Sequence, residues 1–378
     1  MAVKKGTKAL WTLVIAILSF LALMLLLQYT AFWVQMHILA KPFTTASYIP
    51  RPVQEEDKDT YTWLIHMYPP IHNAGAEWMA HAMNLAMVQQ GKHINVVFPK
   101  TTVHEFERIR IIDSNDRPAT NAAIQHSGLL ITHLDKTAMA MNTALVAKRP
   151  LVVIVHNHHS RKFLVECANS LGKNVYFIHN SYWIKNFYKD LKVPSIVVYP
   201  PVSYRDYETS TTREFVTLLN LNANKGGDVL IKIAKAMPEV PFLGVKGGYG
   251  GQVMDRKVKN ITYKDNTPYV KEVYAETGIL LVPSQEESWG RVAVEAMSSG
   301  IPVIAHPTPG LLESCGDAGI FCDRDDIGAW VREITKLRTD KSWYEEKSRA
   351  CRARAEELEP TAQLAAMTKW LSAIRWRE

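Results

Sequence analysis

From Tyr61 to the C-terminus, short apolar runs alternate with longer segments of helical periodicity. The apolar runs are rich in β-branched residues and show no polar alternation, which is typical of parallel strands covered by helices on both faces. The pattern therefore predicts an α/β fold. The expected strands are residues 63–67, 93–98, 128–132, 151–155, 175–178, 196–199, 214–219, 242–245, 261–263, 279–282, 303–305 and 320–322.

The alternation is interrupted at Pro200-Pro201 and at the polar run 207–212, where we place a linker between two halves of similar size. Two Rossmann-like domains facing a cleft are expected, at residues 61–205 and 206–358. Ligands in such folds bind at the carboxyl ends of the strands. The tail is expected to be helical with breaks near Asp340 and Pro360, and the last helix, 359–378, to pack back toward the N-terminal domain.

The N-terminal region contains no Lys, Arg, Asp or Glu between residues 9 and 40. A membrane span needs roughly 20 apolar residues, whereas the apolar core of a cleaved signal peptide has about 7–15. Residues 1–40 are therefore predicted to be an uncleaved membrane anchor with one transmembrane helix, in preference to a signal peptide or a buried core helix. The proline-rich, acidic segment 41–60 is expected to form a stem.

The orientation of this anchor is weakly specified, because lysines and arginines lie on both sides of the span. The bias leans toward a cytosolic N-terminus. Two locations stay open: a Golgi-type lumen in a eukaryote, or the inner membrane in a bacterium. The flanking cations are Lys4, Lys5, Lys8, Lys41, Arg51 and Lys58.

The composition is that of a globular protein, with 47% hydrophobic and 21% charged residues in a chain of 378. The net charge of +7 is interspersed and indicates no nucleic-acid partner. The cysteines, Cys167, Cys315, Cys322 and Cys351, form no CxxC pair, so neither a zinc site nor a disulfide framework is indicated. A single bridge such as Cys315–Cys322 stays open for a lumenal domain.

Residues 278–302 carry the chemistry. An apolar run reaches a Pro283-Ser284 turn, and a helix that holds Glu295 then begins near Gly290. The N-terminus of a helix attracts phosphate, because its backbone N–H groups point outward and the helix dipole is positive there. The stretch predicts a site for the diphosphate of a nucleotide sugar.

This stretch resembles the signature of retaining GT-B glycosyltransferases of family 4. The resemblance covers residues 61–378 and is strongest from 215 to 325. It also includes Lys225-Gly226 after the first strand of the second domain, and a glycine-rich loop at 244–248. The motif itself reads Pro283-Ser284-x-x-Glu287-x-Trp289-Gly290-x-x-x-x-Glu295-Ala296-Met297-x-x-Gly300-x-Pro302.

The resemblance implies a membrane-anchored enzyme that moves a hexosyl-type sugar from a nucleotide diphosphate sugar to a hydroxyl of a glycan, lipid or protein. Retention in this family implies front-face attack, with the leaving phosphate as the base. No metal and no further cofactor are expected. The identity of the sugar, base and acceptor, and the oligomeric state, are not readable from the sequence.

The leaving diphosphate gains negative charge, so the site must hold positive charge there. Lys225 is the first candidate. The family usually places an arginine five residues earlier, but this chain has Asn220 there, which donates a hydrogen bond without bringing charge. Lys246 or Arg291 is expected to take over the role of that arginine.

The remaining donor contacts follow from the same resemblance. The backbone at Gly290, Arg291 and Val292 is expected to contribute N–H groups and the helix dipole. Glu295 is expected to accept both ribose hydroxyls, since each carboxylate oxygen can take one O–H. Glu287 is expected to face the transferred sugar.

In the first domain, a glycine at Gly75 would let the backbone approach the diphosphate closely. His156 follows an expected strand and is predicted to position a hydroxyl or relay a proton near the transferred sugar. The alternative for His156, His158 and His159 is a metal site, but no carboxylate partner is visible in the sequence. Asp323-x-Asp325 could also bind a metal; capping of the following helix by Asp325 or Asp326 is the simpler interpretation.

Two rival functions stay open. The first is a non-catalytic nucleotide-sugar-binding protein on a degenerate GT-B scaffold, which the asparagine at 220 favours. The second is another GT-B chemistry, such as a phosphorylase or a sugar-phosphate epimerase.

Overall fold

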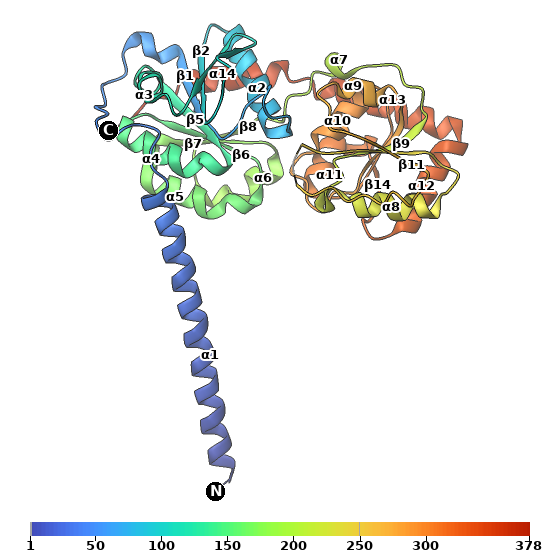
Figure 1. The fold of residues 1–378 in the computed structure, drawn as a ribbon, viewed down its shortest axis with the longest axis horizontal. Helices are drawn as coiled ribbons and strands as arrows, with labels where there is room; N and C mark the ends of the chain where they lie inside the picture. The colour runs from blue at the N-terminus through green and yellow to red at the C-terminus, as the bar shows by residue number, and fades with distance from the viewer. Residues whose placement is uncertain (1, 249) are drawn as a thin grey trace.

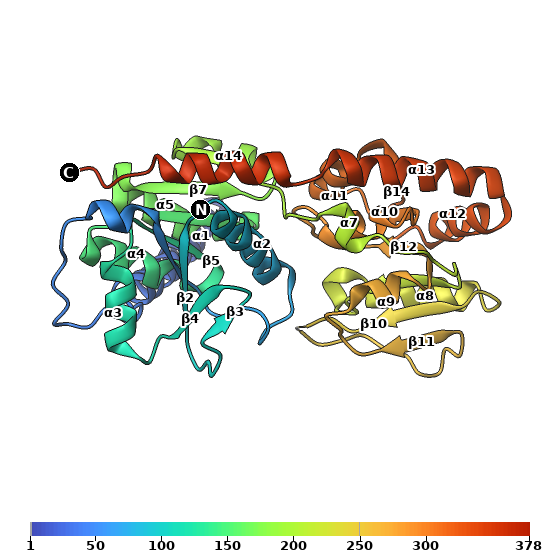
Figure 2. The same cartoon turned by 90° about the horizontal axis from the view of Figure 1, so that it is seen from above.

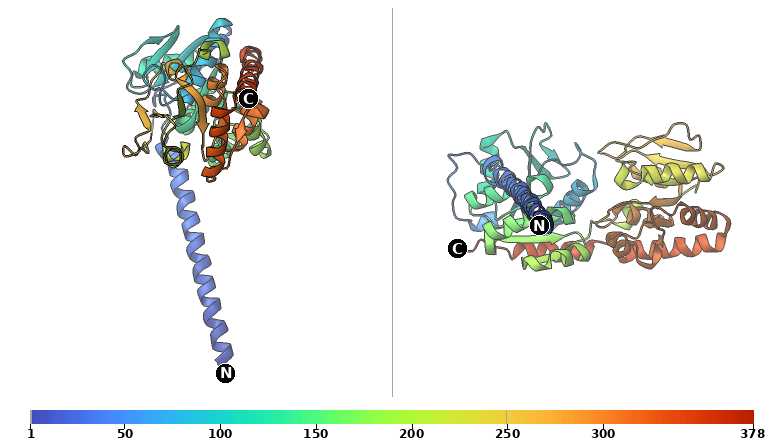
Figure 3. Two further views of the ribbon diagram at one scale, coloured as in Figure 1. Left: turned by 90° about the vertical axis from the view of Figure 1, so that its right-hand side faces the viewer. Right: turned by 90° about the horizontal axis from the view of Figure 1, so that it is seen from below.

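The computed structural model describes residues 2–248 and 250–378, with side chains from Val14 to Met36 and from Ala40 onward. Two α/β domains lie side by side, and the long helix α1 (Ala2–Trp33) projects alone from the first of them (Figures 1 and 3). The GT-B fold expected from the sequence, with one N-terminal apolar helix, is confirmed.

The N-terminal domain is built on an eight-stranded sheet in the order β3-β4-β2-β1-β5-β6-β7-β8. All neighbouring strands are parallel except the β3–β4 pair. The chain leaves the central strand β1 toward β2 on one side and later adds β5 on the other, which makes the carboxyl end of β1 a switch point where ligands bind. The strands are β1 (Thr60–Leu64), β2 (His93–Phe98), β3 (Glu105–Phe106), β4 (Ile109–Asp113), β5 (Leu129–His133), β6 (Leu151–Val155), β7 (Val175–His179) and β8 (Ser195–Val197).

Two hydrophobic cores cover the two faces of this sheet. Successive residues of one strand enter opposite cores: Val153 packs in one core, and Val152 and Ile154 pack in the other. Strands buried on both faces explain the uninterrupted apolar runs of the sequence. The helices of this domain are α2 (Gly75–Gln89), α3 (Arg117–Gln125), α4 (Thr137–Ala147), α5 (Arg161–Leu171) and α6 (Tyr182–Phe187).

The C-terminal domain has a six-stranded parallel sheet in the order β11-β10-β9-β12-β13-β14. Asp326 caps α12 by accepting from the backbone N–H of Ala329 at 2.9 Å, so the capping interpretation is confirmed. All four cysteines are buried and free, so no Cys315–Cys322 bridge forms. The elements are α7 (Tyr204–Tyr207), β9 (Phe215–Leu219), α8 (Gly227–Ala236), β10 (Phe242–Val245), β11 (Ile261–Lys264), α9 (Val270–Tyr274), β12 (Thr277–Val282), α10 (Arg291–Ser298), β13 (Val303–Ala305), α11 (Pro309–Cys315), β14 (Ile320–Phe321), α12 (Ile327–Thr339) and α13 (Lys341–Glu357).

The chain then crosses back to the N-terminal domain. The last helix, α14 (Thr361–Ser372), lies over that domain beside α2 (Figure 2). Its residues Met367 and Leu371 are buried in the core that α2 also contributes to. Tyr61 of β1 and Ser372 bring their hydroxyls to 3.3 Å. The crossing ties the two domains together at a point away from the linker.

The segment expected to form a stem is packed on the N-terminal domain. Phe43 is buried in one of its cores, and its backbone N–H donates to Thr143 Oγ1 at 2.8 Å. Asn142 of α4 donates to the carbonyl oxygens of Met36 and Ala40 at 2.8 and 2.7 Å. The end of α1 therefore joins the domain directly, and residues 41–60 are not a free spacer as predicted. Sequence reasoning read the prolines and charges as solvent-exposed and missed these contacts.

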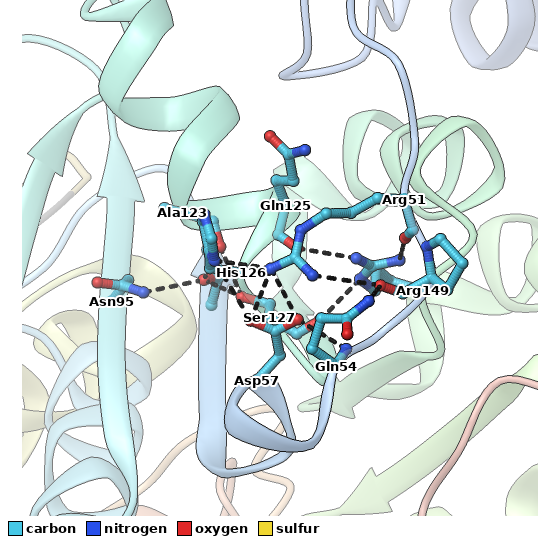
Figure 4. A network of polar contacts seen from close by, with 11 residues as sticks. Arg51, Gln54, Asp57, Asn95, Ala123, Gln125, His126, Ser127 and Arg149 are labelled. Carbon is cyan, nitrogen blue, oxygen red and sulfur yellow. Dashed lines mark hydrogen bonds and ion pairs between the residues drawn. The ribbon is translucent and has the colours of Figure 1, made fainter.

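Arg149 holds this segment in place from within the domain (Figure 4). The side chain is 1% exposed, and its guanidinium donates to the carbonyl oxygens of Ser127 at 2.7 Å, Gln125 at 2.8 Å and Arg51 at 2.9 Å. Arg51 in turn binds the buried carboxylate of Asp57 at 2.9 Å. Burial lowers the pKa of Arg149, and the carbonyl oxygens compensate for the lost hydration.

We expect Arg149→Met to destabilise the N-terminal domain by about 3 kcal/mol or more, because each buried carbonyl left without a donor costs about 1–3 kcal/mol. Thermal unfolding of the detergent-solubilised protein, followed by tryptophan fluorescence, measures the loss. Arg161→Met is the matched control, since the Arg161–Asp190 ion pair is solvent-exposed and should leave the midpoint nearly unchanged. Equal midpoints for the two variants would contradict the role given to Arg149.

Candidate active site

A cavity of about 740 Å³ lies between the two domains, within the range of roughly 300–1,000 Å³ that is common for ligand sites. Every residue that the sequence predicts for the site lines it. From the N-terminal domain these are Gly75 and His156, and from the C-terminal domain Asn220, Lys225, Lys246, Glu287, Gly290, Arg291, Val292 and Glu295. Their individual roles stay predictions.

The C-terminal side of the cavity is built where two neighbouring strands, β9 and β12, end. Gly226 follows β9 with φ of +95°, and a Cβ atom there would lie 2.5 Å from Pro283 Cγ. The N–H of Gln285 donates to the carbonyl of Asn224 at 2.8 Å. The loops after the two strands can touch only because residue 226 is a glycine, and this contact brings Lys225 beside Glu287.

Lys225 Nζ forms an ion pair with Glu287, which also accepts from Ser284 Oγ at 3.2 Å. Both side chains are mostly buried, with 20% and 15% of their surface exposed. An anionic ligand would therefore share Lys225 with Glu287. Pairing with a carboxylate keeps the ammonium in place at the cavity wall.

Asn220, which replaces the usual arginine, is held by its own backbone. Its φ is +69°, and its Oδ1 accepts from the N–H of Asn222 at 3.2 Å. A Cβ atom at Gly247 would lie 2.3 Å from the Asn220 side chain, so the glycine leaves room for it. Lys246, one of the two expected substitutes, pairs with Asp265 at 2.7 Å on the surface side.

Arg291, the other expected substitute, sits in a buried polar cluster. Its Nε donates to Glu295 Oε1 at 2.5 Å and its Nη2 to Tyr207 Oη at 2.5 Å. Tyr274 Oη donates to Glu295 Oε2 at 2.9 Å. Nη1 of Arg291 is buried and has no hydrogen-bond partner among the described residues. Arg291 thus brings to the cavity wall a guanidinium with one donor nitrogen still unused.

The protonation states in this cluster follow from its charges. Burial alone would lower the pKa of Arg291, but Tyr207 and Glu295 raise it in net. Burial, and next the charge of Glu295, raises the pKa of Tyr207 and Tyr274, so both phenols keep their protons. Each oxygen of Glu295 already accepts one bond inside the protein, an arrangement that sequence reasoning did not foresee. Each retains a second acceptor position for a ligand.

The start of α10 faces the same cavity. Gly290 precedes the helix with φ of +94°, and no side chain caps the helix N-terminus. A Cβ atom at Gly290 would lie 2.5 Å from Leu311 Cδ2, so a larger residue would push α11 away. Uncapped N–H groups at a helix start are ready donors for phosphate oxygens.

The N-terminal side of the cavity carries histidines that the sequence analysis did not single out. His66 and His72 follow β1, and their ring nitrogens lie 3.3 and 3.5 Å from Glu77 Oε1 in the first turn of α2. His133 ends β5, and its Nδ1 lies 3.0 Å from Nε2 of His156, the residue after β6. Histidines placed where successive parallel strands end are the sequence signal that could have identified this group.

Burial lowers the pKa of His133 well below its usual value and that of His156 to about 4. His156 is therefore a neutral imidazole at physiological pH. A neutral imidazole can accept a hydrogen bond from a hydroxyl, or donate one through its other nitrogen, so the geometry is compatible with the predicted positioning role.

The two domains contact each other around the cavity. Asn180 Nδ2 donates to Ser288 Oγ at 2.8 Å, and the rings of Tyr199 and Trp289 stack with centroids 4.0 Å apart. His159 Nε2 lies 2.7 Å from Glu286 of the opposite domain. The carboxylate that the sequence did not reveal for the histidine pair is therefore Glu286, and it lies across the domain interface.

Comparison with known proteins identifies the C-terminal domain. Residues 207–358 match the family model described as "Glycosyl transferases group 1". The chain is 32% identical over 129 residues to a D-inositol 3-phosphate glycosyltransferase of Mycobacterium sp. (strain KMS), a match that covers 30% of this chain and 29% of that protein. It is 36% identical over 81 residues to the O-antigen chain mannosyltransferase B of Escherichia coli, covering 21% of this chain and 20% of the relative.

Solved structures resemble nearly the whole of both domains. Anabaena Alr3699/HepE, in complex with UDP-glucose, has a TM-score of 0.69 at 17% identity and covers 82% of this chain and 98% of its own. The sucrose-phosphate synthase of Thermosynechococcus elongatus has a TM-score of 0.65 at 15% identity, covering 82% and 97%. These likenesses confirm the fold. The curated relatives match over less than a third of their length.

Proposed function

We propose that this protein, whose C-terminal domain belongs to the glycosyl transferases group 1 family, is a membrane-anchored glycosyltransferase. It moves a hexosyl-type sugar from a nucleotide diphosphate sugar to an acceptor hydroxyl, with retention of configuration. The observation that carries the proposal is the meeting of Lys225, Arg291, Glu295 and the uncapped start of α10 on one wall of the cavity between the domains.

The donor lies along the C-terminal wall. Its diphosphate meets the N–H groups at the start of α10 and the ammonium of Lys225. The unused Nη1 of Arg291 supplies the charge that the asparagine at 220 does not bring. The ribose hydroxyls donate to the second acceptor positions of Glu295. This wall therefore offers cations and donors to the phosphates and a carboxylate to the diol, which is the polarity that a nucleotide diphosphate needs.

The sugar extends toward the N-terminal domain. Glu287, held by Lys225 and Ser284, faces the transferred sugar, and His156 positions one of its hydroxyls from the opposite wall. Gly75 at the start of α2 allows the backbone to approach the diphosphate. A Cβ atom there would meet nothing within 4 Å, so Gly75 leaves open space at the cavity.

In the transfer step, the acceptor oxygen forms a bond to the anomeric carbon on the face from which the diphosphate leaves. The bond between that carbon and the phosphate oxygen breaks. The acceptor proton passes to the departing phosphate oxygen, so no protein nucleophile is needed. Lys225, Arg291 and the α10 dipole stabilise the negative charge that develops on the diphosphate.

The names of the relatives support this class of donor and acceptor. The mycobacterial relative is a glycosyltransferase of D-inositol 3-phosphate, and the Anabaena neighbour was solved with UDP-glucose. A glycan, lipid or protein hydroxyl is the proposed acceptor. The rival is a non-catalytic nucleotide-sugar-binding protein, which the asparagine at 220 favours.

We expect Lys225→Ala and Glu295→Ala each to reduce transfer by about 10²–10³-fold, because each removes a contact made to the charged donor. Release of nucleoside diphosphate from a panel of nucleotide sugars, with a sugar acceptor present, measures the effect. Lys232→Ala, an exposed lysine on α8, is the control and should retain full activity. Near-normal transfer by both site variants would refute the assignments. Donor binding without turnover by the unmodified protein would establish the binding-protein rival.

The membrane anchor is part of the proposal. The segment Val14–Met36 has a mean hydropathy of 2.2 and none of its most apolar window is buried. By length and composition it can cross a bilayer, although a signal sequence would pass the same test. The end of α1 is fixed to α4 through Asn142, so the cavity would be held at a set orientation to the membrane.

We expect the full chain to stay in the membrane pellet after alkaline carbonate extraction and to retain its N-terminal residues, because an uncleaved span cannot be washed off. A variant that lacks residues 2–31 should appear in the soluble fraction. Protease protection of the C-terminus in sealed vesicles then gives the orientation. Release of the full chain by carbonate, or a mature N-terminus after residue 33, would contradict the anchor.

A further inference from the structure

Three potential metal ligands from separate parts of the N-terminal domain meet at the floor of the cavity. His66 follows β1, His133 ends β5, and Glu77 lies in the first turn of α2. One ligand atom of each residue lies within 4.8 Å of those of the other two. The group lies at the switch point of the sheet, and His66 and Glu77 line the cavity directly.

His133 is prepared to act as a ligand. The side chain is completely buried, and its Nδ1 is hydrogen-bonded to His156 Nε2 at 3.0 Å. Its Nε2 is also buried and has no partner among the described residues. A histidine that binds a metal through one ring nitrogen commonly holds the other in a hydrogen bond, which fixes the tautomer and the ring orientation. A buried imidazole nitrogen without a partner otherwise costs free energy.

Glu77 supplies the negative charge of the group. Its side chain is 2% exposed, and its only ion-pair partners among the described residues are His66 and His72. No lysine or arginine in that part of the chain pairs with it. A carboxylate taken out of water needs a compensating charge, and the α2 dipole provides only a fraction of one.

We propose that His66, Glu77 and His133 bind a divalent transition-metal ion such as Zn²⁺, with His72 beside Glu77 as a further ligand. Two imidazoles and one carboxylate are typical ligands for zinc and its neighbours, whereas Mg²⁺ and Ca²⁺ prefer oxygen alone. His156 acts on this site as a positioning residue through His133. The ion would balance Glu77 and hold together the ends of β1, β5 and α2.

The site is separate from the donor contacts on the opposite domain and does not depend on the proposed transfer reaction. The described residues also contain a second cluster, formed by His158, His159 and Glu286. Its members are much more exposed, with 61% of the His159 side chain and 50% of Glu286 in contact with solvent. Exposed clusters of this kind are commonly occupied by water, so this second cluster serves as the internal comparison.

The test is a Co²⁺ titration of the full-length, chelator-treated protein in detergent, followed by the visible absorption that appears when protein nitrogen atoms coordinate the ion. We expect one Co²⁺ per chain and its displacement by Zn²⁺. Glu77→Gln and His133→Ala should weaken binding by more than the about 10–100-fold that loss of an outer-shell partner such as His156 causes. Glu286→Gln, the matched control, should leave binding unchanged.

Absence of binding, or loss of binding in Glu286→Gln with retention in Glu77→Gln, would overturn the proposal. If the cavity variants do not fold, X-ray absorption by the Zn²⁺-loaded unmodified protein decides the question. Imidazole and carboxylate ligands at about 2.0–2.2 Å are expected, and a shell of water oxygens alone overturns the site. Neither readout requires transfer activity, so failure of this site and failure of the proposed function are distinguishable.

Discussion

The contact between Gly226 and Pro283 is the constraint on which the candidate site depends. β9 and β12 are neighbours in the sheet, but their following loops can touch only because residue 226 has no side chain and adopts a left-handed conformation. The contact places Lys225 beside Glu287 and leaves the start of α10 open to the cavity. Any residue with a Cβ atom at position 226 would separate the cation from the carboxylate and from the helix dipole.

The two walls of the cavity differ in charge chemistry. The C-terminal wall holds Arg291 and Lys225 next to acceptors that keep them in place, and it is suited to an anionic ligand. The N-terminal wall holds buried, neutral histidines and the carboxylate of Glu77, and it is suited to hydroxyls or a metal ion. The Tyr199–Trp289 stack and the return of α14 to the N-terminal domain hold these walls face to face.

Much of the fold was predictable, because strands buried on both faces appear as continuous apolar runs and because Asp340 and Pro360 mark helix boundaries. The short edge strands β3 and β4 were missed, since Arg108 and Arg110 interrupt their apolar pattern. Motif residues such as Glu287 and Lys225 were found because the motif is local in sequence. His66, Glu77 and His133 were not, because only the parallel sheet brings three distant segments to one edge, and the packing of Phe43 and Arg149 was hidden for the same reason.

The central claim is that the diphosphate of the donor rests on Lys225. The most direct test compares the affinities of a nucleoside diphosphate and the matching monophosphate, such as UDP and UMP, for the unmodified protein and for Lys225→Met. Because one charge-assisted contact contributes about 1.5–3 kcal/mol, the substitution should weaken UDP binding by roughly 10–100-fold and leave UMP binding nearly unchanged. An equal loss for both nucleotides, or no loss for either, would contradict the account.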